Sequence, residues 1–230
     1  MQTRINAIVE EINYKTLADI GTDHGYIPIL AVESNKVTKA IACDIKEMPL
    51  QSAKNNIHKR NLAAHIKTRL GPGLTPIKKD EVECITIAGM GGELICNILD
   101  ESYELIQNTK QIILAPQSKV EEVRKYLHQI DFTITNESLV KDEGKYYHIL
   151  NCKKGKEVTY TDMEYYIGKI LLQKKDEIFL EYAELEIKKL ETILKKVLTC
   201  DKKKSKELQK YINWYKSINT RPCFYTSHKL

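Results

Sequence analysis

The sequence predicts an α/β fold with a mostly parallel sheet, followed by a separate helical arm. Up to about residue 154, short apolar β-branched runs alternate with segments of helical periodicity, and several of the runs are apolar on both faces. After that point the pattern is helical throughout. The chain has 230 residues, of which 42% are hydrophobic and 29% charged, so it can form one ordered domain with an appendage.

Each strand is predicted from a short apolar run bounded by polar or turn-forming residues. The predicted strands span residues 15–21, 39–45, 65–71, 84–88, 111–115, 132–140 and 146–152, and helical stretches lie near residues 3–13, 27–34, 49–61, 91–107 and 119–130. The last two strands are separated by the turn KDEGK. We therefore expect the sheet to end in an antiparallel pair.

The helical arm is predicted to begin at Thr161, where TDME has the form of a capping box. Apolar residues then recur at helical spacing as far as Val197, which predicts one long helix. The polar segment TCDKKK interrupts the pattern, and Ser205 is expected to cap a second helix. The two helices predict an antiparallel hairpin or coiled coil, and the predicted domains are residues 1–154 and 155–230.

Charge is unevenly distributed between these parts. The chain carries a net charge of +5, but residues 1–154 contain 20 basic and 20 acidic side chains. The entire excess therefore lies in residues 155–230, which makes the arm the part that favours a polyanionic partner.

The six cysteines form no C-x-x-C pair, and the amino terminus has no apolar stretch typical of a signal peptide. No segment is apolar enough to cross a membrane. The scattered histidines, with no metal-ligand spacing, are expected to be surface or core residues and to bind no metal: His58, His65, His128 and His148. These features predict a cytoplasmic protein.

The segment DIGTDHGY lies between the first predicted strand and the helix that follows it. Glycines there allow a tight turn and let a ligand approach the backbone, and the following helix offers free N–H groups. An ordinary turn between a strand and a helix uses the same residue types, so the segment alone does not distinguish a ligand site from a turn. Its candidate ligand-binding residues are Asp19, Gly21, Thr22, Asp23, His24, Gly25 and Tyr26.

Further candidates follow the next three strands. Asp44 lies about 20 residues after the glycines, where a carboxylate can accept both hydroxyls of a ribose or can cap a helix. Because parallel strands end at one edge of a sheet, these loops are expected to form one site for a nucleoside-bearing cofactor. The other candidates are Ile45, Gly71, Gly73, Ala88, Gly89, Met90 and Gly91. No Walker-type motif occurs, which argues against a nucleoside triphosphatase.

The segments DIGTDHGYIP, IAGMGGELI, LAPQ and DEGKYYHI, with the helical arm behind them, resemble the bacterial tRNA (adenine22-N1)-methyltransferases. The resemblance covers essentially the whole chain, in the family's order and spacing. It implies a class I methyltransferase fold, which is Rossmann-like, with a seven-stranded sheet and a C-terminal coiled-coil domain. It also implies S-adenosylmethionine as the cofactor and tRNA as the partner.

The resemblance implies that the DIGTDHG motif holds the methionine part of the cofactor and that Asp44 binds its ribose. Two positions depart from the family pattern. Pro72 stands where the family has an Asp that can receive the adenine amino group, so the backbone of Gly71 and Gly73 would have to serve. In LAPQ, Ala115 replaces one amide of the family's Leu-Gln-Pro-Asn, and Gln117 retains the other.

The chemistry that the resemblance implies needs little acid–base help, because a sulfonium methyl group is already activated and the acceptor mainly has to be held in line at about 3 Å. Attack by adenine N1 places positive charge on the base, which a carboxylate can stabilise or relieve by accepting an N6 proton. Asp23 is the first candidate and His24 the second. Asp23 can alternatively cap the next helix or bind the cofactor's amino group. Tyr146 and Tyr147 can stack a flipped base or fill the core.

The lysines of the arm are candidates for contacts with RNA phosphates, or they form a solvated face with glutamate partners. They are Lys188, Lys189, Lys195, Lys196, Lys202, Lys203 and Lys204. The expected function is methylation of adenine 22 of tRNA at N1 by a monomer. The alternatives are a small-molecule methyltransferase of the same fold and a non-catalytic RNA-binding protein.

Overall fold

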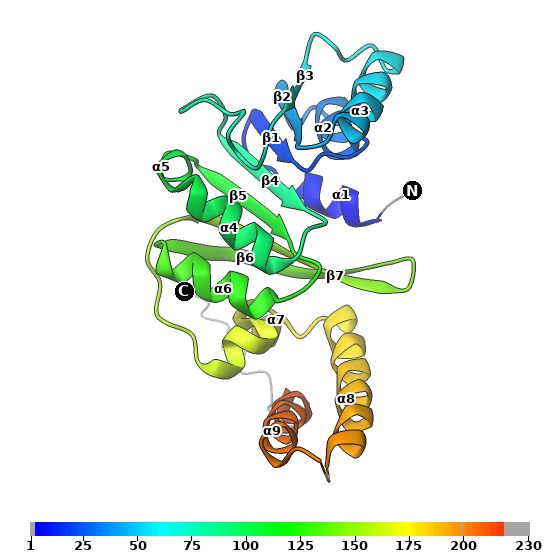
Figure 1. Ribbon diagram of the computed structural model, residues 1–230, viewed down its shortest axis with the longest axis vertical. Coiled ribbons are helices and arrows are strands. Elements are labelled where there is room, and N and C mark those ends of the chain that lie inside the picture. Colours follow the sequence, from blue (N-terminus) through cyan, green and yellow to red (C-terminus); the bar gives the residue numbers. More distant parts are fainter. Residues whose placement is uncertain (1–2, 199, 219–230) are drawn as a thin grey trace, which may run out of the picture. The chain divides into compact units, whose positions relative to one another are not determined.

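Seven strands form a single sheet in the computed structural model, which describes residues 3–198 and 200–218 (Figure 1). The strands are β1 (Thr16–Ile20), β2 (Lys39–Asp44), β3 (Ile66–Leu70), β4 (Cys84–Ala88), β5 (Gln111–Ala115), β6 (Phe132–Asp142) and β7 (Lys145–Lys154). Their order is β3-β2-β1-β4-β5-β7-β6, in which the first five are parallel and β7 is antiparallel to both neighbours. The predicted α/β class, strand number and antiparallel end are confirmed.

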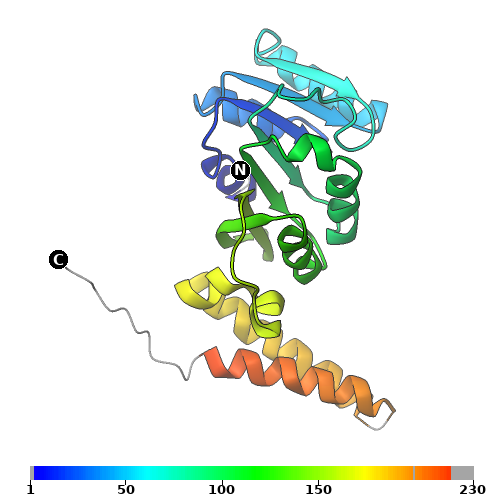
Figure 2. The same ribbon diagram turned by 90° about the vertical axis from the view of Figure 1, so that its left-hand side faces the viewer.

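Helices cover both faces of this sheet (Figures 1 and 2). They are α1 (Thr3–Glu10), α2 (Tyr26–Glu33), α3 (Glu47–Lys59), α4 (Gly92–Glu101), α5 (Tyr103–Ile106) and α6 (Val120–Gln129). Helix α1 packs on α2, and α4 packs on α6. The single helix expected over 91–107 is two helices, because Ser102 leaves helical geometry between α4 and α5.

The sheet is buried on both sides because alternate strand residues point to opposite faces. Leu17, Ala42 and Ile113 belong to the core that includes Ile8 of α1 and Ile57 of α3. The residues between them in the strands, such as Ala18, Ile41 and Ile112, are buried as well. A sheet that is apolar on both faces explains why its strands appear in the sequence as continuous apolar runs.

A buried polar network joins the loop after α1 to the last strand. The Gln111 side chain donates to the Glu11 carbonyl oxygen at 2.7 Å and to Asn151 Oδ1 at 3.0 Å. Asn151 Nδ2 donates to the Glu11 carboxylate at 2.7 Å, and Asn136 Nδ2 donates to its other oxygen at 2.6 Å. These hydrogen bonds connect residues 40 to 140 positions apart in the sequence and hold the end of α1 against β5, β7 and β6, at the antiparallel end of the sheet.

The C-terminal helices form a hairpin, but the first of them is interrupted. A π-helical turn (Glu164–Gly168) leads into α7 (Lys169–Lys174), and α8 (Glu177–Val197) starts only after Lys175, whose φ is +48°. The prediction of one continuous helix was therefore wrong. Asp176 caps α8 by accepting a hydrogen bond from the Phe179 N–H at 2.8 Å, a role typical of Asp.

The second helix of the hairpin, α9 (Lys202–Ile218), also begins earlier than predicted. Asp201 accepts a hydrogen bond from the Lys204 N–H at 2.9 Å, whereas Ser205 lies inside the helix and donates to the Asp201 carbonyl oxygen at 2.8 Å. Asp201 is thus the cap, and the prediction of Ser205 was wrong. Helices α8 and α9 lie side by side (Figure 2), with Leu190, Leu208 and Ile212 buried.

Contacts within the chain define two compact units, Met1–Thr161 and Asp162–Leu230. The first contains the sheet and the second the helical hairpin. The division into independent domains at residue 154 stays a prediction.

Candidate cofactor site

The first loop at the carboxyl edge of the sheet is held by two backbone hydrogen bonds. The N–H groups of Gly21 and Thr22 both donate to the Cys43 carbonyl oxygen at 2.9 Å, which ties the end of β1 to β2. Gly21 has φ +73°, and a Cβ there would lie 2.2 Å from Met90 Cε. Glycine is therefore required at this position, both by the backbone conformation and by the close approach of residues 88–92, which we call the AGMGG loop.

Asp19 is the buried acid at the end of β1. Its side chain is 2% exposed, and Oδ1 accepts a hydrogen bond from the Thr86 hydroxyl at 2.7 Å. Burial raises the pKa of Asp19 from 3.8 to about 6, although the nearby hydroxyl groups of Thr22 and Thr86 oppose that rise. Burial makes the ionised form of this carboxyl group unfavourable, and a cationic ligand would offset that cost of desolvation.

A cavity of about 440 Å³ lies beside this carboxyl group. The predicted residues that line it are Asp19, Gly21, Thr22, Asp23, His24, Tyr26, Ala88, Gly89 and Gln117. The Thr22 hydroxyl is buried, and although it lies close enough to Asp19 to influence its pKa, it has no partner of good hydrogen-bond geometry among the described residues. An unpaired buried hydroxyl in the cavity wall fits a polar ligand.

Asp23 and His24 project from the turn before α2. Asp23 is exposed, with φ +48°, and its Oδ2 lies 3.6 Å from His24 Nε2. The N-cap of α2 is Gly25, and no side chain among the described residues caps this helix. The alternative in which Asp23 serves as the helix cap was therefore wrong, and its carboxylate is left available to a ligand.

Gln117 reaches the same cavity from the loop after β5. Its N–H donates to the Met90 carbonyl oxygen at 2.8 Å, and its Nε2 lies 3.7 Å from the position of a Cβ on Gly89. The AGMGG loop is packed tightly here, since a Cβ on Gly92 would lie 2.6 Å from the Lys119 carbonyl oxygen. Gly92 therefore serves the packing of two loops, while Gly89 faces the cavity.

A second group of predicted residues lies outside that cavity, at the ends of β2 and β3. Asp44 is half-buried and accepts a hydrogen bond from the Lys46 N–H at 2.9 Å, and the N-cap of α3 is Lys46 rather than Asp44. The Gly71 N–H donates to the Asp44 carbonyl oxygen at 3.0 Å. Ile45 is 64% exposed and Leu70 51% exposed. A carboxylate with neighbouring exposed apolar side chains suits a ribose that carries a flat base. Gly25, Gly73, Met90 and Gly91 also do not line the cavity.

Ile27 of α2 and three residues of α1 also line the cavity, and none of them was predicted from the sequence as a site residue; those of α1 are Arg4, Ile5 and Ile8. The Arg4 guanidinium lies over the ring of Tyr147 at 4.7 Å from its centroid. Helical periodicity could identify the apolar face of α1, but nothing in the local sequence indicated that this helix packs at the site. Tyr147 therefore forms a cation–π contact with Arg4.

Two of the histidines, both partly buried, pair with glutamates. His148 Nδ1 lies 3.3 Å from Glu137 Oε1, which also forms a buried ion pair with Arg124 at 2.5 Å. His128 Nε2 lies 2.9 Å from Glu157 Oε1. In residues 3–198 and 200–218, no group of three or more His, Cys, Asp or Glu side chains is placed to hold a metal ion. Within the same ranges, no helix has the length and apolar character that a membrane span needs.

The predicted phosphate-binding lysines of the arm are all exposed. Lys189 forms an ion pair with Glu186 at 3.0 Å, as the solvated-face alternative expects for that residue.

Comparison with known proteins identifies the family. The TrmK model, described as tRNA (adenine(22)-N(1))-methyltransferase, matches residues 17–217. The tRNA (adenine(22)-N(1))-methyltransferase of Bacillus subtilis is 31% identical over 229 residues, which cover 95% of this chain and 96% of that one.

Solved structures agree with this assignment. A Streptococcus pneumoniae protein in complex with S-adenosyl-L-methionine has a TM-score of 0.85 and 31% identity, over 94% of this chain and 97% of that chain. TrmK of M. capricolum, in complex with S-adenosyl-homocysteine, has a TM-score of 0.83 and 31% identity, over 95% and 98% of the two chains. The protein therefore belongs to the TrmK family of tRNA (adenine(22)-N(1))-methyltransferases.

Proposed function

We propose that this protein transfers a methyl group from S-adenosylmethionine to N1 of adenine 22 in tRNA. The observation that carries this proposal is the cavity at the carboxyl edge of the sheet, where a buried acid, an unpaired buried hydroxyl and left-handed glycines meet in a chain of the TrmK family. We also propose that the protein acts in the cytoplasm as a monomer.

The residues of this edge fit the cofactor in two parts. Asp19, buried and acidic, is suited to accept hydrogen bonds from the cationic amino group of the methionine part, and Thr22 can bond the adjoining carboxylate or amine. The Asp44 carboxylate is suited to accept hydrogen bonds from the two ribose hydroxyls. Ile45 and Leu70 can cover the adenine ring with their exposed apolar surfaces. When bound, S-adenosylmethionine supplies a sulfonium methyl group that is already activated for transfer.

The remaining polar groups of the cavity face the acceptor base. Gln117 offers an amide that can hold the adenine edge in line with the methyl group, which is the main requirement of the reaction. Asp23 is placed to stabilise the positive charge that develops on the base, or to accept a proton from N6. His24, next to it, can orient that carboxylate. Whether Asp23 binds the base or the cofactor is decided by the pH dependence of kcat in an Asp23→Asn variant.

Arg4 is suited to bind the phosphate of the target nucleotide. A guanidinium close to the base would oppose the charge that forms during transfer, but it would bind a phosphate favourably. Tyr147 holds it at the mouth of the site through the cation–π contact. The target base has to leave its stack to enter the cavity, and a fixed phosphate would orient the flipped nucleotide.

The test is to incubate the protein with an unmodified tRNA transcript and S-adenosylmethionine, and to map the product by mass spectrometry. One methyl group on N1 of adenine 22 is the expected product. Methylation at another position would contradict the proposed site of action. Binding of tRNA without transfer would favour a non-catalytic RNA-binding protein, and transfer to a free nucleoside but not to tRNA would favour a small-molecule methyltransferase.

A further inference from the structure

The positive charge of the C-terminal unit lies on α9 rather than on α8. Helix α9 contains six lysines and one glutamate, whereas α8 contains four lysines and five glutamates. The charge of α9 alone thus equals the net charge of +5 of the whole chain. A polyanion is therefore expected to approach α9 first.

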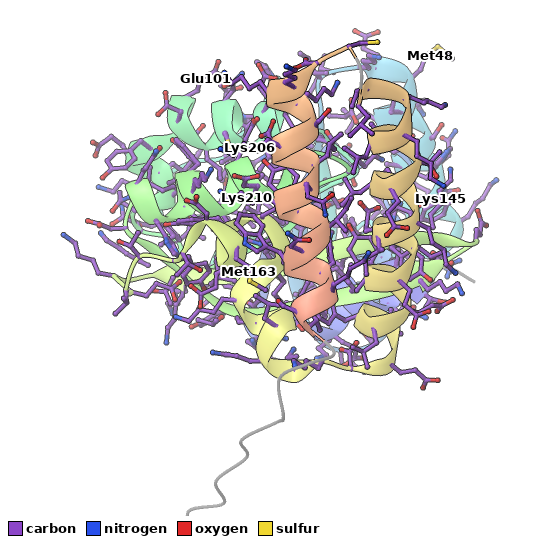
Figure 3. The ribbon with its side chains drawn as sticks, turned by 90° about the horizontal axis from the view of Figure 1, so that it is seen from below. Met48, Glu101, Lys145, Met163, Lys206 and Lys210 are labelled. Carbon is purple, nitrogen blue, oxygen red and sulfur yellow. The ribbon has the colours of Figure 1, made fainter. Side chains whose placement is uncertain are left out.

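The lysines of α9 are divided between two sides of the helix. Leu208, Ile212 and Tyr215 are buried in the hairpin, and Lys216 forms an ion pair across it with Glu191 at 2.7 Å. On the opposite side lie Lys203, Lys206 and Lys210, all exposed. Figure 3 shows Lys206 and Lys210 on the side of α9 that faces away from α8. These three lysines span about two turns of the helix.

Aromatic rings lie beside these lysines. Trp214 is half-buried, and the Lys210 Nζ atom sits 4.5 Å from the centroid of its ring. Next to Trp214, the ring of Tyr211 stacks on Tyr166 with centroids 3.9 Å apart and an angle of 8° between the planes. An open, shallow groove of about 770 Å³ runs over this surface, and the described residues that line it all belong to α9: Lys203, Lys206, Glu207, Gln209, Lys210, Tyr211, Asn213 and Trp214. We call it the α9 groove.

Part of the groove's charge is already balanced. Lys210 pairs with Asp162 at 3.0 Å, and the Tyr211 hydroxyl donates to the Glu207 carboxylate at 2.7 Å. Lys203 and Lys206 form no ion pair with any carboxylate in the described ranges. The groove therefore combines two lysines available to an anion with a rigid aromatic surface and the side-chain amides of Gln209 and Asn213.

We propose that the α9 groove binds a single-stranded segment of tRNA, with an unpaired base stacked against Trp214 and neighbouring phosphates on Lys203 and Lys206. The inference rests on the proposed tRNA substrate and adds a second contact area to it. Aromatic rings accept any base by stacking, and lysines neutralise the backbone, so this combination suits RNA that is not paired. A second copy of the chain would bring the same lysines against each other, which like charges disfavour.

Tryptophan fluorescence can measure this contact directly, because Trp214 is the only tryptophan in the sequence. The full-length protein, without cofactor, is titrated with an unmodified tRNA transcript while tryptophan fluorescence is recorded. Fluorescence should be quenched over the same concentration range in which the anisotropy of labelled tRNA rises. A fully paired RNA duplex of equal length should bind with little quenching, since its bases are not available to stack.

Variants separate the two parts of the contact. Lys203→Gln with Lys206→Gln should lower the slope of log K against log salt by about 1.4 and weaken binding about 25-fold near 0.1 M salt. Trp214→Leu should weaken binding about 5- to 100-fold, and Trp214→Phe should restore most of it. The matched control is Lys39→Gln with Lys79→Gln, which removes two exposed lysines at the start of β2 and before β4, and it should bind as the wild type does.

The proposal is overturned if the groove variants and the control bind tRNA equally, or if the duplex quenches as strongly as tRNA. It is also overturned if light scattering shows that Trp214→Leu changes the oligomeric state rather than RNA affinity. These measurements need no methyl transfer. Loss of the proposed function would appear separately, as wild-type protein that binds tRNA but leaves adenine 22 unmethylated.

Discussion

Replacement of Asp19 by Asn is expected to stabilise the protein in the absence of cofactor. The carboxyl group is buried, and its pKa is raised from 3.8 to about 6 by desolvation. That difference corresponds to about 3 kcal/mol of unfavourable free energy when the group is ionised in the folded state. Asn has nearly the same shape, and its Oδ1 can still accept the hydrogen bond from Thr86.

The sign of the effect depends on pH in a defined way. Because the pKa of Asp19 is higher in the folded protein, the wild type is stabilised by protonation below pH 3.8 and loses that stability as the pH rises through 6. The advantage of Asp19→Asn is therefore about 3 kcal/mol at pH 7.5 but only about 1.6 kcal/mol at pH 5. Urea unfolding followed by circular dichroism measures both values. A variant that is less stable than the wild type by the same amount at both pH values would refute the reasoning.

The same carboxylate links the pH to cofactor affinity. If ionised Asp19 binds the amino group, the dissociation constant of S-adenosylmethionine should rise about tenfold between pH 7.5 and pH 5 as the carboxylate is protonated. Asp19→Asn should bind weakly at both pH values and lose this dependence. Isothermal titration calorimetry distinguishes these outcomes, and an unchanged affinity in the variant would exclude the contact.

Three further substitutions test other parts of the molecule. Asp44→Ala should weaken S-adenosylmethionine binding at least tenfold in calorimetry while tRNA binding is retained, because two hydrogen bonds to a charged acceptor are lost. Gly92→Ala should cost about 3 kcal/mol or more in urea unfolding, since its Cβ would lie 2.6 Å from a carbonyl oxygen, whereas Gly144→Ala, with no atom within 4 Å, should cost only about 1 kcal/mol for its φ of +75°. Arg4→Gln should raise KM for tRNA about tenfold with kcat and cofactor affinity unchanged, and an effect on kcat alone would contradict its role as a phosphate ligand.

The sheet could be predicted from the sequence because burial on both faces leaves a local pattern. Runs such as Cys84–Ala88 and Gln111–Ala115 were located with their observed ends, since a charged residue precedes each run and Gly89 or Pro116 follows it. The break at Lys175 was missed because apolar residues continue at helical spacing on both sides of it. Lys175 has a left-handed backbone conformation and Asp176 caps the next helix, but neither residue changes the spacing of the apolar positions.

The candidate site was predictable only where the ligand-binding groups lie in the loops of the strands themselves. The loop after β1 and Gln117 were found because they follow strand ends, and parallel strands bring those ends together. Arg4 could not be found in this way. Its place depends on the packing of α1 and on Tyr147 across the sheet, which are contacts between distant parts of the sequence. The spacing of polar and apolar residues also predicts that the lysines of α8 and α9 are exposed. It does not show which of these lysines lie on a side of the hairpin that a ligand can reach.

The polar network around Glu11 sets an order for folding of the sheet unit during synthesis. The first helix emerges first, but its anchor at Asn151 is made some 140 residues later. Until β7 inserts between β5 and β6, the loop after α1 lacks its hydrogen bonds to Asn151, although the packing of α1 on α2 can already form. A nascent chain can therefore complete the loop after β1 early, whereas the hydrogen bonds that anchor the end of α1 to β7 form only after that strand is synthesised.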